Sequence, residues 1–289
     1  MSDSFYHEFA PAKINLALHI IDKKHDMHLL DSLVVFTTIG DNLSAKISNA
    51  DSLKIIGPFA SSLKDSQNNL VLKAIKLFRE KYPKSLPKGL SFVLEKNLPI
   101  ASGIGGGSAD CAATLRVLAR FSKYDISNDD LLNLARVLGA DVSACLFSKV
   151  LKMQGFGEKI TLIDSLPSTY ILLVNPLEEV STKQIFENLK RIDNDVLPEI
   201  KQGFSNVEQL TNYLLTTRND LEEPAIKSAG IIKVLSNYIG NISGCHFARM
   251  TGSGASIFGL FSDEQKAKMA MKSIQDKWPN FWVEQGKLI

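Results

Sequence analysis

The sequence predicts an α+β protein with two domains, and three observations support this fold class. The chain has 289 residues, and at about 150 residues per domain this length suits two domains. Strand-like alternation dominates the opening part, whereas helical spacing and strand patterns follow one another in the second half. Apolar residues make up 45% of the chain, as is usual for folded globular proteins, so each domain can bury a core.

The opening part is expected to form several strands. Residues 9–21 alternate, with Ile14, Leu16 and Leu18 on one face, and Lys13 lies early in this strand. A turn is expected at residues 40–42, because Gly-Asp-Asn is typical of turns. Further strands are expected at 33–38, 43–47 and 53–56.

Helices and strands then alternate up to the middle of the chain. Apolar spacing predicts a helix that starts at Asn69 and ends before Pro83, followed by a strand at 90–95. Small residues at 109–121 predict a second helix, and a third, capped by Asn128 or Asp129, is expected to run to Leu138. A hairpin is expected at 150–163 and a strand at 170–174.

The remainder of the chain is expected to mix both kinds of element. Helices are predicted near 182–191, 206–215, 224–239 and 263–276, and strands near 246–250, 255–261 and 281–285. The hairpin separates two regions that can each form a core. We therefore expect an N-terminal domain at 1–155 and a C-terminal domain at 156–289.

Composition and charge exclude several classes of function. The chain carries 33 Lys and Arg against 31 Asp and Glu, without a run of like charges, so no nucleic-acid partner is expected. No apolar run is long enough to cross a membrane, and the first residues lack a secretory signal. Three isolated cysteines suit a reducing compartment, so a cytoplasmic protein is expected.

A glycine-rich segment at 99–109 is the strongest candidate for a binding site. It lies between a predicted strand and a predicted helix, and it holds Gly103, Gly105, Gly106 and Gly107. Glycine lets backbone amides turn toward a ligand, and the helix start adds free amides and the positive end of a dipole. This combination favours binding of a phosphate group. A flexible connection is the alternative.

Other glycine-rich and catalytic motifs do not match this sequence. No Gly-Lys-Ser/Thr follows the glycines, and Ser108 replaces the third glycine of the dinucleotide fingerprint. His-Arg-Asp and Asp-Phe-Gly of protein kinases are absent, as are HExxH, Cys-x-x-Cys and Gly-x-Ser-x-Gly. A second glycine segment at 251–255 precedes a strand, and the two segments together suggest a ligand cleft.

Three segments in this order make the chain resemble the GHMP kinase superfamily. They are residues 11–15 (Pro-Ala-Lys-Ile-Asn), 99–109 and 250–255 (Met-Thr-Gly-Ser-Gly-Ala), and further landmarks lie at 138–142, 157–158 and 219–222. The resemblance spans nearly the whole chain. It implies an N-terminal domain like ribosomal protein S5 and a ferredoxin-like C-terminal domain.

The resemblance also implies an activity. Its landmarks match the branch that transfers the γ-phosphoryl group of ATP to the 2-hydroxyl of a cytidine-diphosphate-linked methylerythritol, in the non-mevalonate route to isoprenoids. It implies Mg²⁺ with Ser108 as a contact, and Lys13 and Asp141 as catalytic residues, of which Asp141 accepts the hydroxyl proton. The implied ATP-binding residues are Lys96, Pro99, Gly103, Gly105, Gly106, Gly107 and Ser108. A monomer or a weak homodimer is expected.

The expected binding site for the acceptor carries one departure from the family. Asp26-Met27-His28 stands where the family has Gly-Tyr-His, so a methionine replaces the tyrosine that stacks on cytosine. His28 is expected to bind the pyrimidine edge and Phe186 to form the opposite wall. Asn15, Thr182 and Asp141 complete the expected acceptor contacts. In addition, Ser143 replaces the family's proline after Asp-Val.

Two other functions remain open at this point. The chain can be another kinase of the superfamily, acting on mevalonate, homoserine or a sugar, or a non-catalytic member that binds a nucleotide or metabolite. The presence of both Lys13 and Asp141 argues against the non-catalytic alternative.

Overall fold

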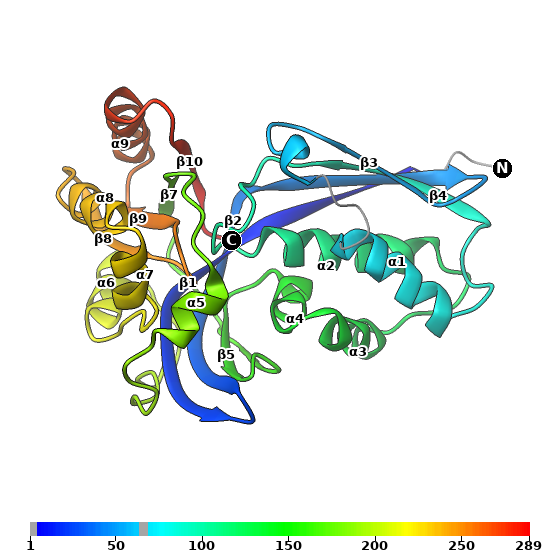
Figure 1. Ribbon diagram of the computed structural model, residues 1–289, viewed down its shortest axis with the longest axis horizontal. Helices are drawn as coiled ribbons and strands as arrows, with labels where there is room; N and C mark the ends of the chain where they lie inside the picture. Colours follow the sequence, from blue (N-terminus) through cyan, green and yellow to red (C-terminus); the bar gives the residue numbers. More distant parts are fainter. Residues whose placement is uncertain (1–4, 64–68) are drawn as a thin grey trace. The chain divides into compact units, whose positions relative to one another are not determined.

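The computed structural model describes residues 5–63 and 69–289, which form two compact units (Figure 1). The first unit consists of the described residues within three ranges, which are Met1–Ala12, Gly40–Ile100 and Gly105–Phe147. The second takes Lys13–Ile39, Ala101–Ile104 and Ser148–Ile289. These units interleave along the chain, whereas the expected domains are consecutive, so a domain boundary at 155/156 stays a prediction. The prediction about a secretory signal concerns in part residues 1–4, which lie outside the described residues.

Two long strands contribute to both units. They are β1 (Phe5–Lys24) and β2 (Met27–Ser48), which pair with each other. Residues 10–20 of β1 are buried without interruption, so Lys13 lies in the interior rather than on a solvated face. This burial means that both faces of the strand are covered by protein.

The turn predicted at 40–42 is wrong, because β2 runs through these residues. The Asp41 carboxylate does not bond within a turn of its own. Its Oδ1 accepts hydrogen bonds from the amides of Asn97 at 2.6 Å and Leu98 at 2.9 Å. Contacts with a distant segment therefore override the local preference of Gly-Asp-Asn for a turn.

In the first unit, β2 pairs antiparallel with β4 (Gly89–Glu95), and β4 pairs parallel with β3 (Ser52–Ile56). These strands and the helix predicted from Asn69 are confirmed. The second predicted helix begins earlier than expected, at Gly106. The helices of this unit are α1 (Leu70–Lys81), α2 (Gly106–Phe121), α3 (Asn128–Leu138) and α4 (Ala140–Phe147), with the short 3-10 helix η1 (Ala60–Ser62).

The cap of α3 differs from the prediction. Ser127, rather than Asn128 or Asp129, is the N-cap, and its hydroxyl accepts a hydrogen bond from the amide of Asp130. The Asp130 carboxylate accepts one from the amide of Ser127 in return. This reciprocal capping box satisfies two amides at the helix start.

The second unit contains a four-stranded antiparallel sheet in the order β10-β7-β9-β8. Its strands are β7 (Tyr170–Asn175), β8 (Cys245–Met250), β9 (Ile257–Phe261) and β10 (Trp282–Lys287). Helices connect β7 to β8 and β9 to β10, which gives the ferredoxin-like order that the family resemblance implies. Its helices are α5 (Thr182–Glu187), α6 (Val207–Leu215), α7 (Glu222–Ser228), α8 (Ile231–Gly240) and α9 (Glu264–Lys277).

One helix predicted in this unit is divided. The range 224–239 holds the end of α7 and most of α8, because Ala229 adopts an extended conformation between them. Gly230 follows directly, and glycine disfavours a helix interior by about 1 kcal/mol relative to alanine. The predicted hairpin is confirmed as β5 (Leu151–Gly155) and β6 (Lys159–Leu162).

The core of the second unit covers one face of its sheet. Leu172 of β7 and Ile257 of β9 share a buried cluster with Leu235 of α8 and Ala267 and Ile274 of α9. Both helices therefore pack on the same side of the sheet, as their positions in Figure 1 indicate. The three cysteines, all within the described residues, form no disulfide, and Cys111 and Cys145 are buried. Among the residues that the structure describes, no helix combines the length and apolar character needed to span a bilayer.

His19 joins β1 to two other segments of the second unit and is almost fully buried. Its Nε2 accepts a hydrogen bond from the amide of Arg218 at 3.0 Å, so its Nδ1–H donates to the carbonyl of Asp195 at 2.7 Å. Burial lowers the pKa of His19, and the positive charge of Arg218 adds to this, although the Asp195 carbonyl and the charges of Asp220 and Asp31 oppose it. The neutral ring is therefore the stable form in the fold.

We expect this histidine to make the fold less stable in acid. Its folded pKa lies below the unfolded value of about 6.5, so its contribution is complete above that pH and is lost as pH falls toward the folded pKa. For one proton, the free energy of unfolding changes by at most about 1.4 kcal/mol per pH unit. Urea unfolding between pH 5 and 8 measures it, and His19→Asn should flatten the curve. An unchanged curve would contradict this role. His28 titrates in the same direction and stays present in both proteins.

Candidate active site

The glycine-rich segment between β4 and α2 has the geometry of an anion-binding loop. Gly103 and Gly105 adopt φ angles of 74° and 65°, in the left-handed region that favours glycine. Gly105 is the N-cap of α2, and no side chain of the described residues caps this helix start or places an acidic group in its first turn. The amides of Gly106, Gly107 and Ser108 are thus at the positive end of the helix dipole, where a phosphate group is stabilised.

Within the second unit, the two glycine segments are in direct contact. A Cβ atom on Gly103 would lie 2.7 Å from the carbonyl oxygen of Gly254 and 2.8 Å from that of Thr251. A Cβ on Gly252 would lie 2.5 Å from the carbonyl oxygen of Gly103. Ser256 Oγ also donates a hydrogen bond to the carbonyl of Ser102 at 2.6 Å. Only glycines permit this approach of two backbones.

Three polar groups, which are a backbone amide, a hydroxyl and a side-chain amide, hold the second glycine segment in place. The amide of Asn15 donates to Thr251 Oγ1 at 2.8 Å, and Thr182 Oγ1 lies 2.8 Å from Ser253 Oγ. Asn219 Nδ2 donates to the carbonyls of Met250 and Gly252, both at 2.9 Å. Two residues predicted to bind the acceptor, Asn15 and Thr182, thus lie beside this segment. The role of Asn219 was not anticipated, although residues 219–222 were a landmark of the family.

Lys96 lies in a buried ionic cluster of the first unit. Its Nζ donates to Asp41 Oδ2 at 2.5 Å and to Asp110 Oδ2 at 2.7 Å, and all three side chains are nearly inaccessible. The side chain predicted to bind ATP is therefore held by two carboxylates. Pro99, also predicted at the ATP site, is buried at the start of the loop. Neither Asp41 nor Asp110 was singled out from the sequence.

Burial governs the ionisation of this cluster. Desolvation raises the pKa of Asp110 to about 7, and the attraction of Lys96 offsets only part of this effect. The two carboxylates raise the pKa of Lys96 despite its burial, so the ammonium stays charged. The second carboxylate oxygen of Asp110, Oδ1, is buried and has no hydrogen-bond partner in the described parts of the chain.

Two residues predicted to bind the cytosine are in contact in the second unit. The rings of His28 and Phe186 have centroids 4.9 Å apart with an interplanar angle of 35°. Burial lowers the pKa of His28, and nearby Lys23 lowers it further. Met27, at the start of β2, is 54% exposed. A pyrimidine cannot lie between rings this close, so a base would stack against the outside of this pair or against Met27.

The two predicted catalytic residues belong to different units. Lys13 is 4% exposed on β1 of the second unit, where its amide donates to the carbonyl of loop residue Ile104 at 2.9 Å. Asp141 lies in the first turn of α4 in the first unit. Their catalytic pairing stays a prediction.

The described residues do not form a metal site by themselves. No group of three or more His, Cys, Asp or Glu side chains gathers within residues 5–63 and 69–289 in a way that could hold an ion. Ser108 supplies one hydroxyl at the start of α2, which is fewer donors than magnesium requires. The magnesium contact of Ser108 therefore stays a prediction.

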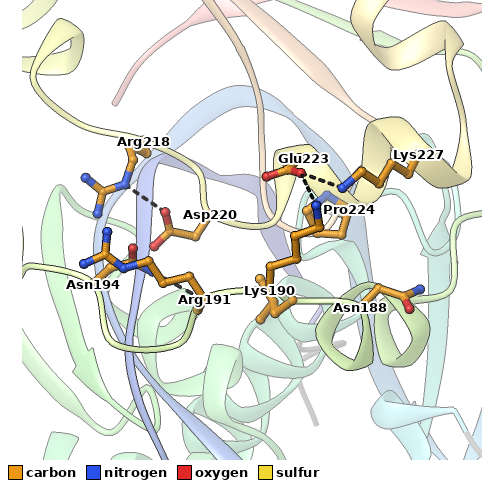
Figure 2. Close-up of a pocket in the computed structure, with 10 residues that line it drawn as sticks. Asn188, Lys190, Arg191, Asn194, Arg218, Asp220, Glu223, Pro224 and Lys227 are labelled. Carbon is orange, nitrogen blue, oxygen red and sulfur yellow. Dashed lines mark hydrogen bonds and ion pairs between the residues drawn. The ribbon is translucent and has the colours of Figure 1, made fainter.

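A pocket of about 250 Å³ in the second unit is a poor candidate for the phosphate site, although it is lined by cations (Figure 2). Arg218 pairs with Asp220 at 2.9 Å, and Lys190 and Lys227 pair with Glu223 at 3.6 and 2.5 Å. Arg191 pairs with Asp193 at 3.1 Å. Each cationic side chain therefore already has a carboxylate partner.

Comparison with known families places both glycine segments in matched regions. Residues 69–149 match the GHMP kinases N terminal domain, and residues 218–280 match the GHMP kinases C terminal domain. A solved structure of 4-(cytidine 5'-diphospho)-2C-methyl-D-erythritol kinase superimposes with a TM-score of 0.79 at 28% identity, covering 98% of this chain and 99% of that one. The predicted two-domain α+β fold is thereby confirmed.

Two bacterial relatives are similar over nearly the whole chain. A 4-diphosphocytidyl-2-C-methyl-D-erythritol kinase of Chelativorans is 42% identical, covering 95% of this chain and 93% of the relative. One of Cereibacter sphaeroides is also 42% identical, covering 97% and 98%. A homoserine kinase of Cytophaga hutchinsonii shares the fold, with a TM-score of 0.70 at 17% identity over 100% of this chain and 96% of that one.

Proposed function

Because the chain belongs to the family of 4-diphosphocytidyl-2-C-methyl-D-erythritol kinases within the GHMP kinases, we propose that it transfers the γ-phosphoryl group of ATP to the 2-hydroxyl of 4-diphosphocytidyl-2-C-methyl-D-erythritol. This reaction belongs to the non-mevalonate route to isoprenoid precursors. Cys111 and Cys145 form no disulfide, which suits the reducing cytoplasm, the proposed location.

The observation that carries the proposal is the 42% identity along nearly the whole chain. The start of α2 behind left-handed glycines supports it, since the amides of a helix N-terminus can bind the phosphates of ATP. The homoserine kinase, at 17% identity, supports the fold alone and does not favour another acceptor.

The proposed chemistry is an in-line phosphoryl transfer. The 2-hydroxyl oxygen forms a bond to the γ-phosphorus while the bond from this phosphorus to the β-γ bridging oxygen breaks, so ADP leaves with that oxygen. Asp141 accepts the hydroxyl proton, and Lys13 orients Asp141 and stabilises the negative charge on the attacking oxygen. Transition states of this kind carry charge on phosphate oxygens, so alignment and charge stabilisation provide most of the catalysis. The amides of Gly106, Gly107 and Ser108 are placed to bind that charge.

An acceptor panel tests the proposal. The chain is incubated with ATP and magnesium in the presence of the cytidyl substrate, mevalonate, homoserine or galactose, and ADP release is measured. We expect release with the cytidyl substrate, and mass spectrometry should find one added phosphoryl group on it. Activity on mevalonate, homoserine or galactose alone would instead identify another kinase of the superfamily. Binding of ATP without release of ADP in any of these reactions would favour a non-catalytic member.

We expect Met27→Tyr to lower KM for the cytidyl substrate. Stacking of a base on an aromatic ring contributes about 1–3 kcal/mol, whereas a methionine sulfur contributes about 0.3–1.5 kcal/mol. The difference predicts a KM lower by about five-fold. Met269→Tyr is a matched control, because Met269 is also exposed in the second unit but lies on α9. An unchanged KM in Met27→Tyr would remove this residue from the cytosine site.

A further inference from the structure

The buried cluster of Lys96, Asp41 and Asp110 connects the segments at both ends of the glycine loop. Lys96 follows β4 directly and starts the segment that leads into the loop, whereas Asp110 lies on α2, into which the loop runs. Asp41 comes from β2. One ammonium group therefore links β2, the segment before the loop and the helix after it, through contacts of 2.5 and 2.7 Å.

Asp41 fixes the segment before the loop through its other oxygen. While Oδ2 accepts from the Lys96 ammonium, Oδ1 accepts from the amides of Asn97 and Leu98. The backbone of Lys96 is also held, since its amide donates to the carbonyl of Ile56 at 2.8 Å and its carbonyl accepts from the amide of Phe59 at 3.2 Å. Residues 96–98 thus have little freedom to move relative to β2 and β3.

The same ammonium lies directly beneath the first turn of α2. A Cβ on Gly106 would be 3.0 Å from Lys96 Nζ, tighter than an ordinary contact, and Asp110 lies about one turn further along the helix. The first turn and the second turn of α2 are therefore both set against this charged group. A displacement of Lys96 would move the amides of residues 106–108.

We propose that Lys96 is a positioning residue, whose ammonium, held by Asp41 and Asp110, sets the place of the α2 amides that bind the terminal phosphates of ATP. This inference rests on the proposed function. It assigns the Lys96 side chain a role beneath the phosphate site rather than in contact with ATP. Breaking a buried ionic group leaves an uncompensated charge, so substitution here also lowers stability. The test must therefore separate nucleotide affinity from folding.

The dissociation constant of ATP, measured by isothermal titration calorimetry well below each variant's melting temperature, provides this separation. We expect Lys96→Met to weaken ATP binding between about 10- and 100-fold, the size of effect that displacement of a binding group by about 1 Å produces. Affinity for the cytidyl substrate should stay within about two-fold. Loss of stability alone would change the active fraction but not the affinity of the folded molecules.

If Lys96→Met does not fold, two substitutions at Asp110 still test the positioning role. Asp110→Ala leaves the Lys96–Asp41 pair with balanced charge but removes the link to α2, so ATP binding should weaken about ten-fold. Asp110→Asn keeps an oxygen that can accept from Lys96, so its ATP affinity should stay within about three-fold of the wild type. Equal effects of the alanine and asparagine variants would overturn the positioning role.

Arg79→Met is the control for destabilisation. Arg79 and Asp51 form a partly buried ion pair in the same unit, with two hydrogen bonds of 2.6 and 2.7 Å that join α1 to the segment before β3. This variant should lower the melting temperature and leave ATP affinity unchanged. Equal weakening of ATP binding in Arg79→Met, or wild-type affinity in both Lys96→Met and Asp110→Ala, would overturn the inference.

An error in the proposed function would give a different experimental result from an error in the role of Lys96. A wild-type chain that binds ATP but does not phosphorylate the cytidyl substrate would contradict the proposed reaction while the comparison of ATP affinities remains decisive for Lys96. A wild-type chain that binds no ATP would overturn both proposals.

Discussion

Asp141→Asn is expected to lower kcat by about 10²- to 10⁴-fold, which is the contribution of a positioned general base. Asparagine has nearly the shape of aspartate but cannot accept the proton that leaves the 2-hydroxyl. The α2 amides that we propose to bind the phosphates are unaltered, so ATP affinity should stay close to that of the wild type. Steady-state kinetics with the cytidyl substrate, together with calorimetric titration of ATP, measure both quantities.

Asp129→Asn is the matched control for this substitution. Asp129 lies in the first turn of α3 as Asp141 lies in the first turn of α4, and both helices belong to the first unit. Both substitutions remove a carboxylate that interacts favourably with a helix dipole, which costs about 0.3–1 kcal/mol of stability. Only Asp141→Asn should reduce kcat. Near-normal turnover in Asp141→Asn, or an equal loss in Asp129→Asn, would exclude the general-base role.

Local sequence patterns predicted most of the elements in this fold. The helix expected from Asn69 to Pro83 is α1 (Leu70–Lys81), because its apolar spacing and its cap are local features. The turn expected at 40–42 failed for the opposite reason. Asp41 has its partners at Lys96, Asn97 and Leu98, which are 55 to 57 residues away in sequence, and no local pattern reports them.

The difference between local features and contacts distant in sequence also applies to the candidate site. The glycine loop could be recognised because its glycines, strand and helix are adjacent in sequence. The contact of Gly103 with Gly252 and Gly254 and the anchoring of Met250 by Asn219 depend on how the second unit folds. Lys96 was expected at ATP from family resemblance, yet its ammonium faces two carboxylates that only the fold brings together. Residue types alone could not separate a ligand contact from a buried support.

The contact between the two glycine segments is expected to make Gly103→Ala strongly destabilising. Alanine in the left-handed conformation costs about 1–2 kcal/mol, and overpacking against two backbone carbonyls adds about 1–3 kcal/mol. We therefore expect the free energy of unfolding to fall by about 2–5 kcal/mol, measured by urea denaturation. Backbone atoms cannot move aside as a flexible side chain would, so relaxation should relieve little of this strain.

Gly107→Ala provides the contrast, because within residues 5–63 and 69–289 a Cβ on Gly107 would meet only Leu70 Cδ1, at an ordinary distance of 3.8 Å. Its place in the first turn of α2 favours alanine over glycine by up to about 1 kcal/mol, so stability should be unchanged or slightly higher. The two variants add the same methyl group within four residues of each other. A similar loss of stability in both would mean that glycine is needed throughout the loop for its flexibility. A loss confined to Gly103→Ala would instead trace the requirement to the close approach of the two backbones, since only that position lacks room for a side chain.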